Sequence, residues 1–396
     1  MIDFEIPAEL AAQRDEIRDF VAEEIVPFER DPRLTRHGPN EELRNELVAL
    51  ARKAGLLTFQ APRRFGGREP SHREQAVLYE AAGWSTLGPV ALNCAAPDEG
   101  NMFILSKVAN AEQVEKFLVP VIDGRQRSVF AMTEPGGAGS DPGQLATEAV
   151  FDGTEYVING HKWLITGADG ARTWIIMARV VANQHGPDGP TLFLCEGDTP
   201  GIELERVMDT MDRNYVQGHG VVRFTDLRLP ASAVLGEVGQ ALRYAQQRLV
   251  PARLTHCMRW LGAAERVHSI AVEHARTRTA FGKPLGEHQG VGFMLADNEI
   301  ALQHCRLAIW WACWTLDNGA KGRHESSMVK ASVSEELFKV ADRCVQILGG
   351  MGISDETVVG MIFSDMRAFR LYDGPTEVHK YAIARQVLRD PAEVRP

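Results

Sequence analysis

Cysteine and long apolar runs are both scarce in this sequence. The 396 residues include six cysteines, scattered without any Cys-x-x-Cys pair, so we expect reduced packing residues rather than a disulfide framework. The longest strongly apolar run, Leu307 to Leu316, has about ten residues and is too short to cross a bilayer. The start, Met1 to Glu5, has neither a basic nor an apolar segment. We therefore expect no signal peptide, no membrane contact and a cytoplasmic location.

Positive charge is scarce as well. Lys and Arg number 43 against 53 Asp and Glu, for a net charge of -10, and a field of that sign disfavours a nucleic-acid partner. The sequence also lacks the G-x-S-x-G, G-x-x-x-x-G-K-[ST] and H-E-x-x-H motifs. Its 12 histidines form no cluster with metal-ligand spacing. Hydrolase, kinase and zinc-enzyme chemistry are therefore unsupported, and we expect no metal site.

Two changes of hydrophobic period divide the chain. Up to about residue 127 the apolar spacing is helical, as in 8–28, 41–54, 71–83 and 111–122. From 128 to about 235 the period is two, with strand candidates at 173–181, 191–195, 202–207 and 220–227. After Pro230 the helical spacing returns, with a long stripe over 254–271 and helices predicted over 290–318, 326–348 and 373–388. This order predicts an α+β multidomain protein with a central antiparallel β domain of sandwich or barrel type.

The clearest turn signals lie in the central region. Asp152-Gly153 predicts one turn, and Asn159-Gly160 lies between the strand-like runs Tyr156–Ile158 and Lys162–Thr166. Both central positions of a tight hairpin turn need a positive φ, which Asn-Gly accepts readily. We therefore predict a hairpin at Asn159-Gly160.

A glycine-rich segment follows one predicted strand. It runs from Phe130 to Asp141 as F-A-M-T-E-P-G-G-A-G-S-D. Small residues let the backbone come close to a ligand, and successive N–H groups can form an anion-binding concavity. Further along, Lys162–Gly167 reads K-W-L-I-T-G and puts an aromatic ring near a hydroxyl. Each segment alone is typical of an ordinary loop or strand, but the pair is far more specific.

Together the two segments resemble the acyl-CoA dehydrogenase flavoprotein family, where such a loop and strand hold the flavin ring and the substrate thioester. Arg278–Leu285 with Glu287–Gln289 looks like the family's R-x-x-F-G-x-x-[IL]…[EDQ]-x-Q segment, and Gln346–Gly352 looks like its Q-x-x-G-G-x-G turn. The resemblance covers nearly the whole chain. It implies an N-terminal α-helical domain over 1–127, a central antiparallel β-barrel over 128–235, and a C-terminal four-helix bundle over 236–396.

The resemblance also implies an FAD cofactor and assigns contacts to matching positions. On the flavin side these are Phe130, Met132, Thr133, Ser140, Trp163, Ile165 and Thr166, with Thr166 near flavin N5. The FAD of the neighbouring subunit would meet Arg278, Phe281, Gln289, Gln346, Gly349 and Gly350, and Pro375 and Glu377 complete the cofactor contacts. Sites shared in this way imply a homodimer or a homotetramer. One departure is that the family's flavin-flanking Trp usually stands where this chain has Leu164.

The family's usual base is the Glu of a Y-E-G-T turn, and here Asp373 takes that place in the sequence Y-D-G-P-T. The resemblance implies that its carboxylate removes the α-proton as a hydride leaves the β-carbon. Its side chain is one methylene shorter, so substrate or backbone must come closer by about 1 Å. From the residues alone, Asp373 could instead be the N-cap of the last helix.

For the substrate, the resemblance implies contacts with Ser140, Gly374 and Arg253, where Arg253 matches an arginine that contacts the coenzyme A nucleotide. A solvated helix charge is the alternative for Arg253. Asp98 and Glu99 match the region that lines the acyl-tail pocket, where two acids could recognise a hydroxyl. They could equally cap a helix or face solvent.

Three segments point to a subgroup: Asn93–Met102, His256–Arg259 and Asp373–Pro375. They look like the dehydrogenase domain of acyl-CoA dehydrogenase family members ten and eleven and their bacterial relatives. This implies α,β-dehydrogenation of a medium or longer acyl-CoA, with or without branches or hydroxyl groups, to the trans-2-enoyl-CoA, with electrons passed to an electron-transfer flavoprotein. The alternatives are an acyl-carrier-protein-linked dehydrogenase, a flavin oxidase on the same fold, and a DNA-associated member without dehydrogenase activity.

Overall fold

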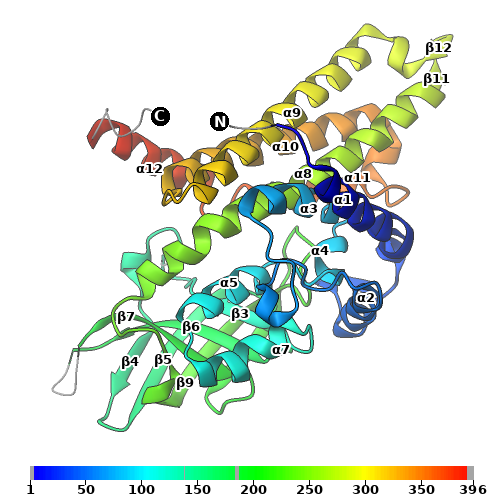
Figure 1. The fold of residues 1–396 in the computed structure, drawn as a ribbon. Coiled ribbons are helices and arrows are strands. Elements are labelled where there is room, and N and C mark those ends of the chain that lie inside the picture. The colour runs from blue at the N-terminus through cyan, green and yellow to red at the C-terminus, as the bar shows by residue number, and fades with distance from the viewer. Residues whose placement is uncertain (1–3, 138, 183–186, 390–396) are drawn as a thin grey trace. The chain divides into compact units, whose positions relative to one another are not determined.

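The computed structural model describes residues 4–137, 139–182 and 187–389, and Figure 1 shows its ribbon. The first three residues, which enter the signal-peptide expectation, lie outside these ranges. By its internal contacts the chain forms two compact units. The helical unit comprises Met1–Asp31, Pro70–Pro89 and Arg253–Pro396, and the sheet unit comprises Pro32–Glu69 and Val90–Ala252. Each unit is therefore assembled from segments that are far apart in the sequence.

The sheet unit contains one eight-stranded sheet in the order β10-β7-β6-β4-β5-β9-β8, with β3 paired to β6. Its strands are β3 (Ser128–Ala131), β4 (Glu148–Phe151), β5 (Glu155–Thr166), β6 (Thr173–Val180), β7 (Gly189–Glu196), β8 (Ile202–Met208), β9 (His219–Pro230) and β10 (Val234–Leu235). The four strands predicted between 173 and 227 are confirmed as β6 to β9. A two-residue ladder, β1 (Leu34–Thr35) with β2 (Gly38–Pro39), lies outside this sheet.

The main sheet is mixed rather than wholly antiparallel. β3 and β4 both run parallel to β6, whereas the remaining pairs are antiparallel. Among the described strands the pairing runs from β10 to β8. The sheet is therefore mixed where an antiparallel one was expected, and its pairing does not describe a closed barrel. Parallel pairing needs a long connection between partners. The glycine-rich segment, β4 and β5 lie between β3 and β6, and hydrophobic period alone does not reveal which strands meet.

The hairpin predicted at Asn159-Gly160 is wrong, because both residues lie inside the continuous strand β5. The register of β5 against β9 shifts at this point, which marks a bulge. A Cβ on Gly160 would lie 2.3 Å from Thr147 Oγ1, so glycine is required here for close approach rather than for a turn. Asn159 Oδ1 accepts a hydrogen bond from the backbone N–H of Asp226 on β9, at 2.9 Å. The turn predicted at Asp152-Gly153 is confirmed between β4 and β5.

Side chains of β6 alternate between two apolar cores of the sheet unit. Trp174 and Ile176 belong to a cluster with residues of β5, β7 and β9. Ile175 and Met177 belong to a second cluster, which includes helix residues on the other face. This alternation is the period of two that predicted the strand. The helices of this unit are α2 (Glu41–Lys53), α5 (Asp98–Val108), α6 (Ala111–Gln113) and α7 (Val119–Ile122).

The helical unit is built mainly from the C-terminal third of the chain. Its helices are α1 (Ala8–Phe20), α3 (His72–Ala82), α9 (Gln289–Asp317), α10 (Arg323–Leu348), α11 (Val359–Phe369) and α12 (Thr376–Arg389), with a short ladder of β11 (Thr279–Ala280) and β12 (Lys283–Pro284). α8 (Ala241–Thr277) and α4 (Gly88–Ala91) continue from one unit into the other. α10 packs against α9, α11 and α12. The helical C-terminal region is confirmed, while α11 was not predicted.

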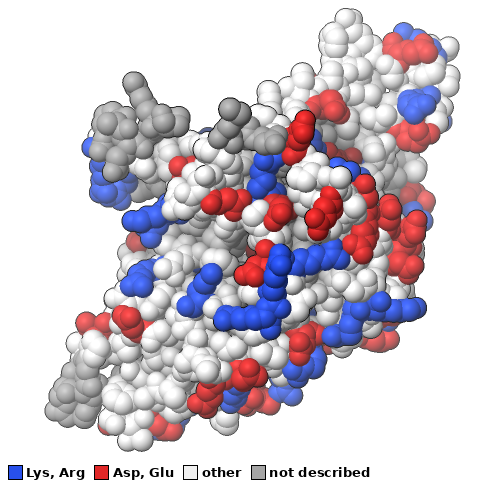
Figure 2. Space-filling view, in the orientation of Figure 1, with Lys and Arg blue, Asp and Glu red and all other residues white. Residues whose placement is uncertain are grey.

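The surface charges, the helix lengths and the cysteines can be compared with what composition led us to expect. On the face drawn in Figure 2, acidic and basic side chains are interspersed among the described residues. None of the described helices is long and apolar enough to span a membrane. All six cysteines are buried and carry free thiols, which confirms that they pack in the interior rather than form disulfides.

Candidate functional site

The predicted base lies in a tight turn between α11 and α12. Asp373 has a φ of 53° and Gly374 a φ of 105°, a left-handed region that aspartate tolerates and glycine favours. A Cβ on Gly374 would lie 2.8 Å from His379 Nε2. Because α12 begins only at Thr376, Asp373 is not its N-cap. Glu377, the other carboxylate in this segment, is exposed on the first turn of α12.

Two residues of α8 contact the base turn. Arg253 donates from Nε to the carbonyl oxygen of Asp373 at 2.9 Å. It is 9% exposed, and burial lowers the pKa of its guanidinium, against the opposing effect of Asp373. Arg253 is therefore not a solvated helix charge. His256, one helical turn on, places Nε2 3.3 Å from Asp373 Oδ2.

A buried lysine supports the same turn from α10. Lys330 has no exposed surface, and its Nζ donates to the carbonyl oxygens of Phe369 at 2.6 Å and Gly374 at 3.1 Å. Nζ also lies 5.0 Å from the centre of the Phe369 ring. Burial lowers the pKa of Lys330 to about 8. Sequence reasoning missed this residue, although Lys330 shares a helix face with Ser326 and Ser334, both completely buried.

In the sheet unit, the root of the glycine-rich segment is fixed by a buried ion pair. Lys162 Nζ lies 2.8 Å from Glu134 Oε1 and donates to the carbonyl oxygen of Met132 at 3.0 Å. The Glu134 carboxylate also accepts from the backbone N–H of Ala146 at 2.7 Å and of Thr147 at 2.9 Å. Burial lowers the pKa of Lys162 to about 8. Burial acts to raise the pKa of Glu134, but Lys162 and these donors outweigh it and hold it below its usual value.

After Glu134, the described part of the glycine-rich segment is exposed, and the end of β5 lies beside it. Ser140 and the neighbouring described glycines are exposed, and the Trp163 N–H donates to the carbonyl oxygen of Thr133 at 3.1 Å. A register shift between Lys162 and Ile165 leaves Leu164 at a φ of 53°, a strained conformation of the kind found at functional sites. The Ile165 side chain is 1% exposed and packs into the sheet core, so only its backbone is available to a ligand.

Thr166 begins a short polar chain that sequence reasoning missed. Its Oγ1 lies 3.0 Å from His219 Nδ1, and His219 Nε2 lies 3.0 Å from Asp212 Oδ2. The carboxylate accepts the Nε2 hydrogen, so in neutral His219 the other nitrogen accepts the hydroxyl hydrogen of Thr166. The pKa of Asp212 is held below its usual value because the His219 hydrogen bond outweighs the opposing effect of burial. The three residues therefore fix the hydroxyl of Thr166.

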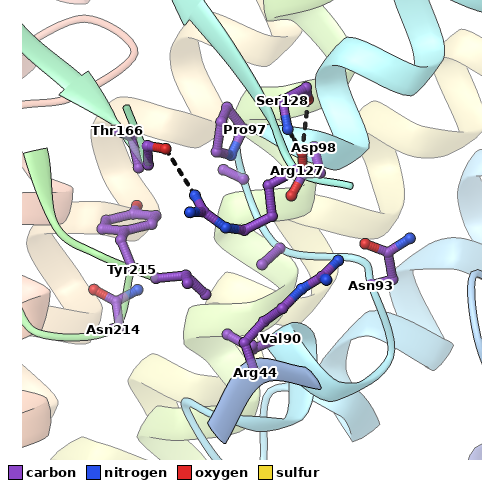
Figure 3. Close-up of a pocket in the computed structure, with 14 residues that line it drawn as sticks. Arg44, Val90, Asn93, Pro97, Asp98, Arg127, Ser128, Thr166, Asn214 and Tyr215 are labelled. Atoms are coloured by element: carbon purple, nitrogen blue, oxygen red, sulfur yellow. Dashed lines mark hydrogen bonds between the residues drawn. The ribbon is translucent and has the colours of Figure 1, made fainter. Parts of the chain in front are cut away.

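A polar cavity lies beside Thr166 in the sheet unit, and Figure 3 shows its lining. Asp98 lines it and accepts at Oδ1 from the Ser128 backbone N–H and hydroxyl, both at 2.6 Å. Burial raises the pKa of Asp98. Glu99 is also buried, at 7% exposure, but does not line this cavity. Neither acid faces solvent, and Asp98 serves to fix the start of β3.

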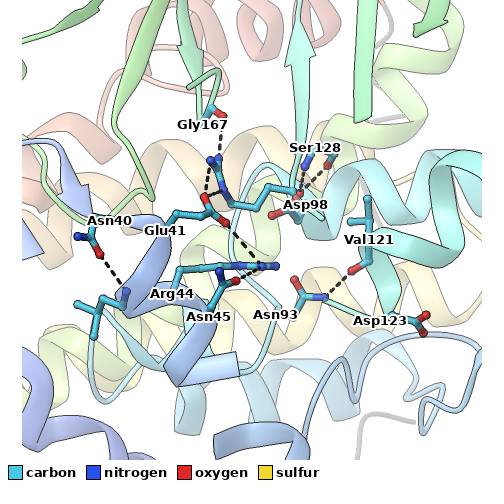
Figure 4. A network of polar contacts seen from close by, with 12 residues as sticks. Asn40, Glu41, Arg44, Asn45, Asn93, Asp98, Val121, Asp123, Ser128 and Gly167 are labelled. Carbon is cyan, nitrogen blue, oxygen red and sulfur yellow. Dashed lines mark hydrogen bonds and ion pairs between the residues drawn. The ribbon is translucent and has the colours of Figure 1, made fainter. Parts of the chain in front are cut away.

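Two buried arginines, Arg44 and Arg127, line this cavity, and Figure 4 shows the polar network around Arg44. Arg127 Nε donates to Glu41 Oε2 at 2.8 Å, and Nη1 donates to the carbonyl oxygen of Gly167 at 2.7 Å. Arg44 Nη1 donates to Asn45 Oδ1 at 3.0 Å, and burial lowers the pKa of Arg44. This network holds the backbone that follows Thr166.

The segments assigned to a neighbouring subunit's FAD are open in the helical unit. Phe281 lies in the β11–β12 turn with 96% of its surface exposed. Arg278, Gln289 and Gln346 are exposed as well. A Cβ added to Gly349 or Gly350 would meet no other atom within 4 Å. Exposed aromatic surface, open glycine backbone and nearby polar donors fit contact with FAD, where the aromatic ring would pack and the donors would meet phosphate oxygens.

Family comparisons cover almost the whole chain. The family models "Acyl-CoA dehydrogenase, N-terminal domain", "middle domain" and "C-terminal domain" match residues 7–125, 129–227 and 239–388. The chain is 36% identical over 398 residues to the Mycobacterium tuberculosis protein named "Probable acyl-CoA dehydrogenase FadE2", with 98% of this chain and 97% of that protein covered. It is 34% identical over 395 residues to acyl-CoA dehydrogenase family member 11 of Rattus norvegicus, with 95% of this chain covered.

That alignment covers 50% of the rat protein, so the chain spans about half the length of this relative. Among solved structures, a "putative acyl-CoA dehydrogenase" from Mycobacterium abscessus matches with a TM-score of 0.90 and 38% identity. The match covers 98% of this chain and 100% of that one.

Proposed function

Because this chain belongs to the acyl-CoA dehydrogenase family of FAD-containing oxidoreductases, we propose that it oxidises the Cα–Cβ bond of an acyl-CoA thioester. The substrate is a medium or longer acyl chain, with or without branches or hydroxyl groups, and the product is the trans-2-enoyl-CoA. FAD supplies the hydride acceptor when bound. Electrons then pass to an electron-transfer flavoprotein.

The observation that carries this proposal is the setting of Asp373. Its carboxylate is 21% exposed in a left-handed turn, so one oxygen can reach a substrate while the backbone stays fixed. Arg253 and Lys330 hold the carbonyl oxygens of Asp373 and Gly374. A base must be held within about 3 Å of the proton that it removes. The rigid turn supports Asp373 as that base and its backbone N–H as a donor to the thioester oxygen.

The remaining assignments follow from matching positions. Phe130, Met132, Thr133, Ser140, Trp163, the backbone of Ile165, and Thr166 contact the flavin, and Pro375 and Glu377 complete that contact. Ser140, Gly374, Arg253, Asp98 and Glu99 contact the substrate. Arg278, Phe281, Gln289, Gln346, Gly349 and Gly350 reach the FAD of a second copy, which makes the enzyme a homodimer or homotetramer. The corresponding domains are 1–127, 128–235 and 236–396.

The test is an anaerobic titration of the purified flavoprotein with saturated acyl-CoAs of different length, branching and hydroxylation. We expect one class to bleach the flavin absorbance near about 450 nm, a general flavin band. Asp373→Asn, which keeps the shape and removes the base, should reduce the rate by about 100- to 10,000-fold while the acyl-CoA still binds. Bleaching that persists in this variant would refute the base assignment.

The rival functions predict different results in the same experiment. An acyl-carrier-protein-linked dehydrogenase would leave the flavin oxidised with every acyl-CoA and bleach only with the carrier-bound thioester. A flavin oxidase would consume oxygen at a rate that matches its turnover. A DNA-associated member would show salt-dependent retention on immobilised DNA.

A further inference from the structure

His256 is buried beside the base turn, and its two ring nitrogens have different partners. The residue is 4% exposed. Nε2 lies 3.3 Å from Asp373 Oδ2, and Nδ1 lies 3.0 Å from Nη2 of Arg259. The ring packs against Tyr372, with centroids 4.7 Å apart. The packing against Tyr372 and the contacts at both nitrogens therefore fix the orientation of the His256 ring.

The arginine partner decides which nitrogen carries the hydrogen. A guanidinium can only donate, so Nδ1 of His256 must accept from Arg259. In the neutral imidazole the hydrogen then lies on Nε2, which faces Asp373 Oδ2. His256 is thus oriented to donate to one specific oxygen of the base carboxylate.

Charged and titratable groups from three helices lie around the base turn that His256 contacts. Arg259 contacts His256 Nδ1 from α8, while Arg253 on α8 and Lys330 on α10 donate to the carbonyl oxygens of Asp373 and Gly374. His379 lies on α12, the helix that follows the turn. Asp373 is the carboxylate that these groups surround. A proton on His256 Nδ1 would point at the Arg259 guanidinium, which like-charge repulsion disfavours. With Nδ1 accepting from Arg259, His256 acts as a hydrogen-bond donor toward Asp373.

Resting on the proposed base role of Asp373, we propose that His256 is a positioning residue that holds Asp373 Oδ2 and so orients Oδ1 to meet the substrate. Aspartate is shorter than the glutamate that the family usually has here, so its oxygens have less reach. Because a misplacement of about 1 Å can cost about 100-fold in rate, a shorter base gains from a fixed donor. Arg259 contributes by fixing the tautomer of His256.

The step that this contact controls is proton removal. The Cα–H bond of the acyl thioester breaks, its electron pair stays on the thioester as an enolate, and the proton forms an O–H bond with Asp373 Oδ1. In heavy water the acid hydrogen exchanges with solvent, and return of a deuteron labels Cα. This label reports the base without any electron transfer.

The experiment compares variants of matched shape in the FAD-loaded oligomer. His256→Gln keeps an N–H donor where Nε2 stands, whereas His256→Asn keeps a polar group only near the Nδ1 position. We expect His256→Asn and His256→Ala to lower both α-deuterium incorporation and anaerobic flavin reduction by about 10- to 100-fold. We expect His256→Gln to stay within about 5-fold of the wild type, and the acyl-CoA Kd to change by less than about 3-fold in all three.

The outcomes separate the two proposals. Wild-type exchange that is lost in Asp373→Asn but unchanged in His256→Ala and His256→Asn would overturn the positioning role and leave the proposed function intact. Equal losses in His256→Gln and His256→Asn would overturn the donor role as well, because the ring would then matter only for packing. No exchange in the wild type with any acyl-CoA or carrier-bound thioester would overturn the proposed function itself.

A side-chain swap gives a second measurement. Glutamate at 373 extends one methylene further into the 3.3 Å space between the carboxylate and His256. We expect Asp373→Glu to lose activity in the wild-type background and to regain at least about 5-fold when His256→Ala removes the ring. Equal losses from Asp373→Glu in both backgrounds would contradict a direct coupling between these two residues.

Discussion

Two lysines, one in each unit, are completely buried, and their partners differ. Lys162 lies against the Glu134 carboxylate at 2.8 Å. Lys330 donates to two backbone carbonyl oxygens and faces the Phe369 ring. Burial lowers the pKa of each to about 8. The same residue type therefore serves two purposes: Lys162 neutralises a carboxylate that fixes a loop, while Lys330 fixes a turn and keeps its charge near Asp373.

This difference shows where local charge remains. In the sheet unit, the Glu134 carboxylate accepts hydrogen bonds from Lys162 and from two backbone N–H groups. The charges at the root of the loop are therefore balanced. At the base turn, Arg253 and Lys330 both donate to carbonyl oxygens, and their positive charges interact with the Asp373 carboxylate. The loop root is thus rigid, and its carboxylate is paired with Lys162. The base turn is rigid as well, but the positive charges that hold it leave the Asp373 carboxylate in place for the reaction.

Lys162→Met should have the largest effect on stability. It leaves Glu134 buried without its counter-ion, and loss of one partner of a buried pair costs about 3–5 kcal/mol. We expect a decrease of that size in the free energy of unfolding, measured by chemical denaturation. Lys116→Met is the control, since its pair with Glu196 is about half exposed on both sides and is worth less than about 1 kcal/mol. Similar losses in both variants would contradict the proposed role of the buried pair.

Lys330→Met should cost less stability but more activity. It leaves the Phe369 and Gly374 carbonyl oxygens without this donor but strands no carboxylate, so we expect a loss of about 2 kcal/mol. Because the base turn is freed, α-deuterium incorporation should fall by at least about 10-fold. Lys339→Met, on the exposed side of the same helix, should change neither quantity measurably. A variant that loses stability but exchanges at the wild-type rate would show that Lys330 matters only for folding.

The two regions also differ in what their sequences predicted. The segment Y-D-G-P-T was singled out because it resembles the family's Y-E-G-T turn, and the structure forms a tight turn there with Gly374 at a φ of 105°. Its supports were not predicted, since Lys330 and His256 lie on long amphipathic helices where a polar residue usually faces solvent. Contacts between α8, α10 and the turn depend on tertiary packing, which helical period does not encode.

In the sheet unit, local pattern predicted strands better than their pairing. β6 to β9 were found from alternation, yet Asn159-Gly160 gave a bulge inside β5 instead of a hairpin. The reason is the close approach of Thr147 to Gly160, a contact between strands that the dipeptide cannot show. The parallel partners of β6 were missed for the same reason.

His379 provides a pH test of the positive field at the base turn. Burial, with Arg253 and Lys330, lowers the pKa of His379 to about 4. The unfolded chain has a histidine pKa near about 6.5, so between pH 6.5 and 4 it binds more protons than the folded protein. Stability therefore falls as the pH decreases through this range, by about 2 kcal/mol between pH 7 and pH 5 from this residue. His379→Gln should remove that part of the decrease, as measured by unfolding at both pH values. An identical decrease in wild type and variant would contradict the lowered pKa.

The smallest effect is expected at the far end of the Thr166 chain in the sheet unit. Asp212→Asn keeps the size of the side chain but replaces a charged acceptor of the His219 Nε2 hydrogen with a neutral one, at a cost of about 1 kcal/mol. Asp209→Asn is the matched control, because Asp209 is exposed and pairs with Arg36 at the surface; it should cost less than about 0.5 kcal/mol. If Asp212→Asn instead approaches the loss of Lys162→Met, the Asp212 carboxylate contributes far more to stability than one ordinary hydrogen bond. The Thr166 chain would then matter as much for folding as the Lys162–Glu134 pair, and the sheet unit would depend on a buried carboxylate at both ends of its candidate site.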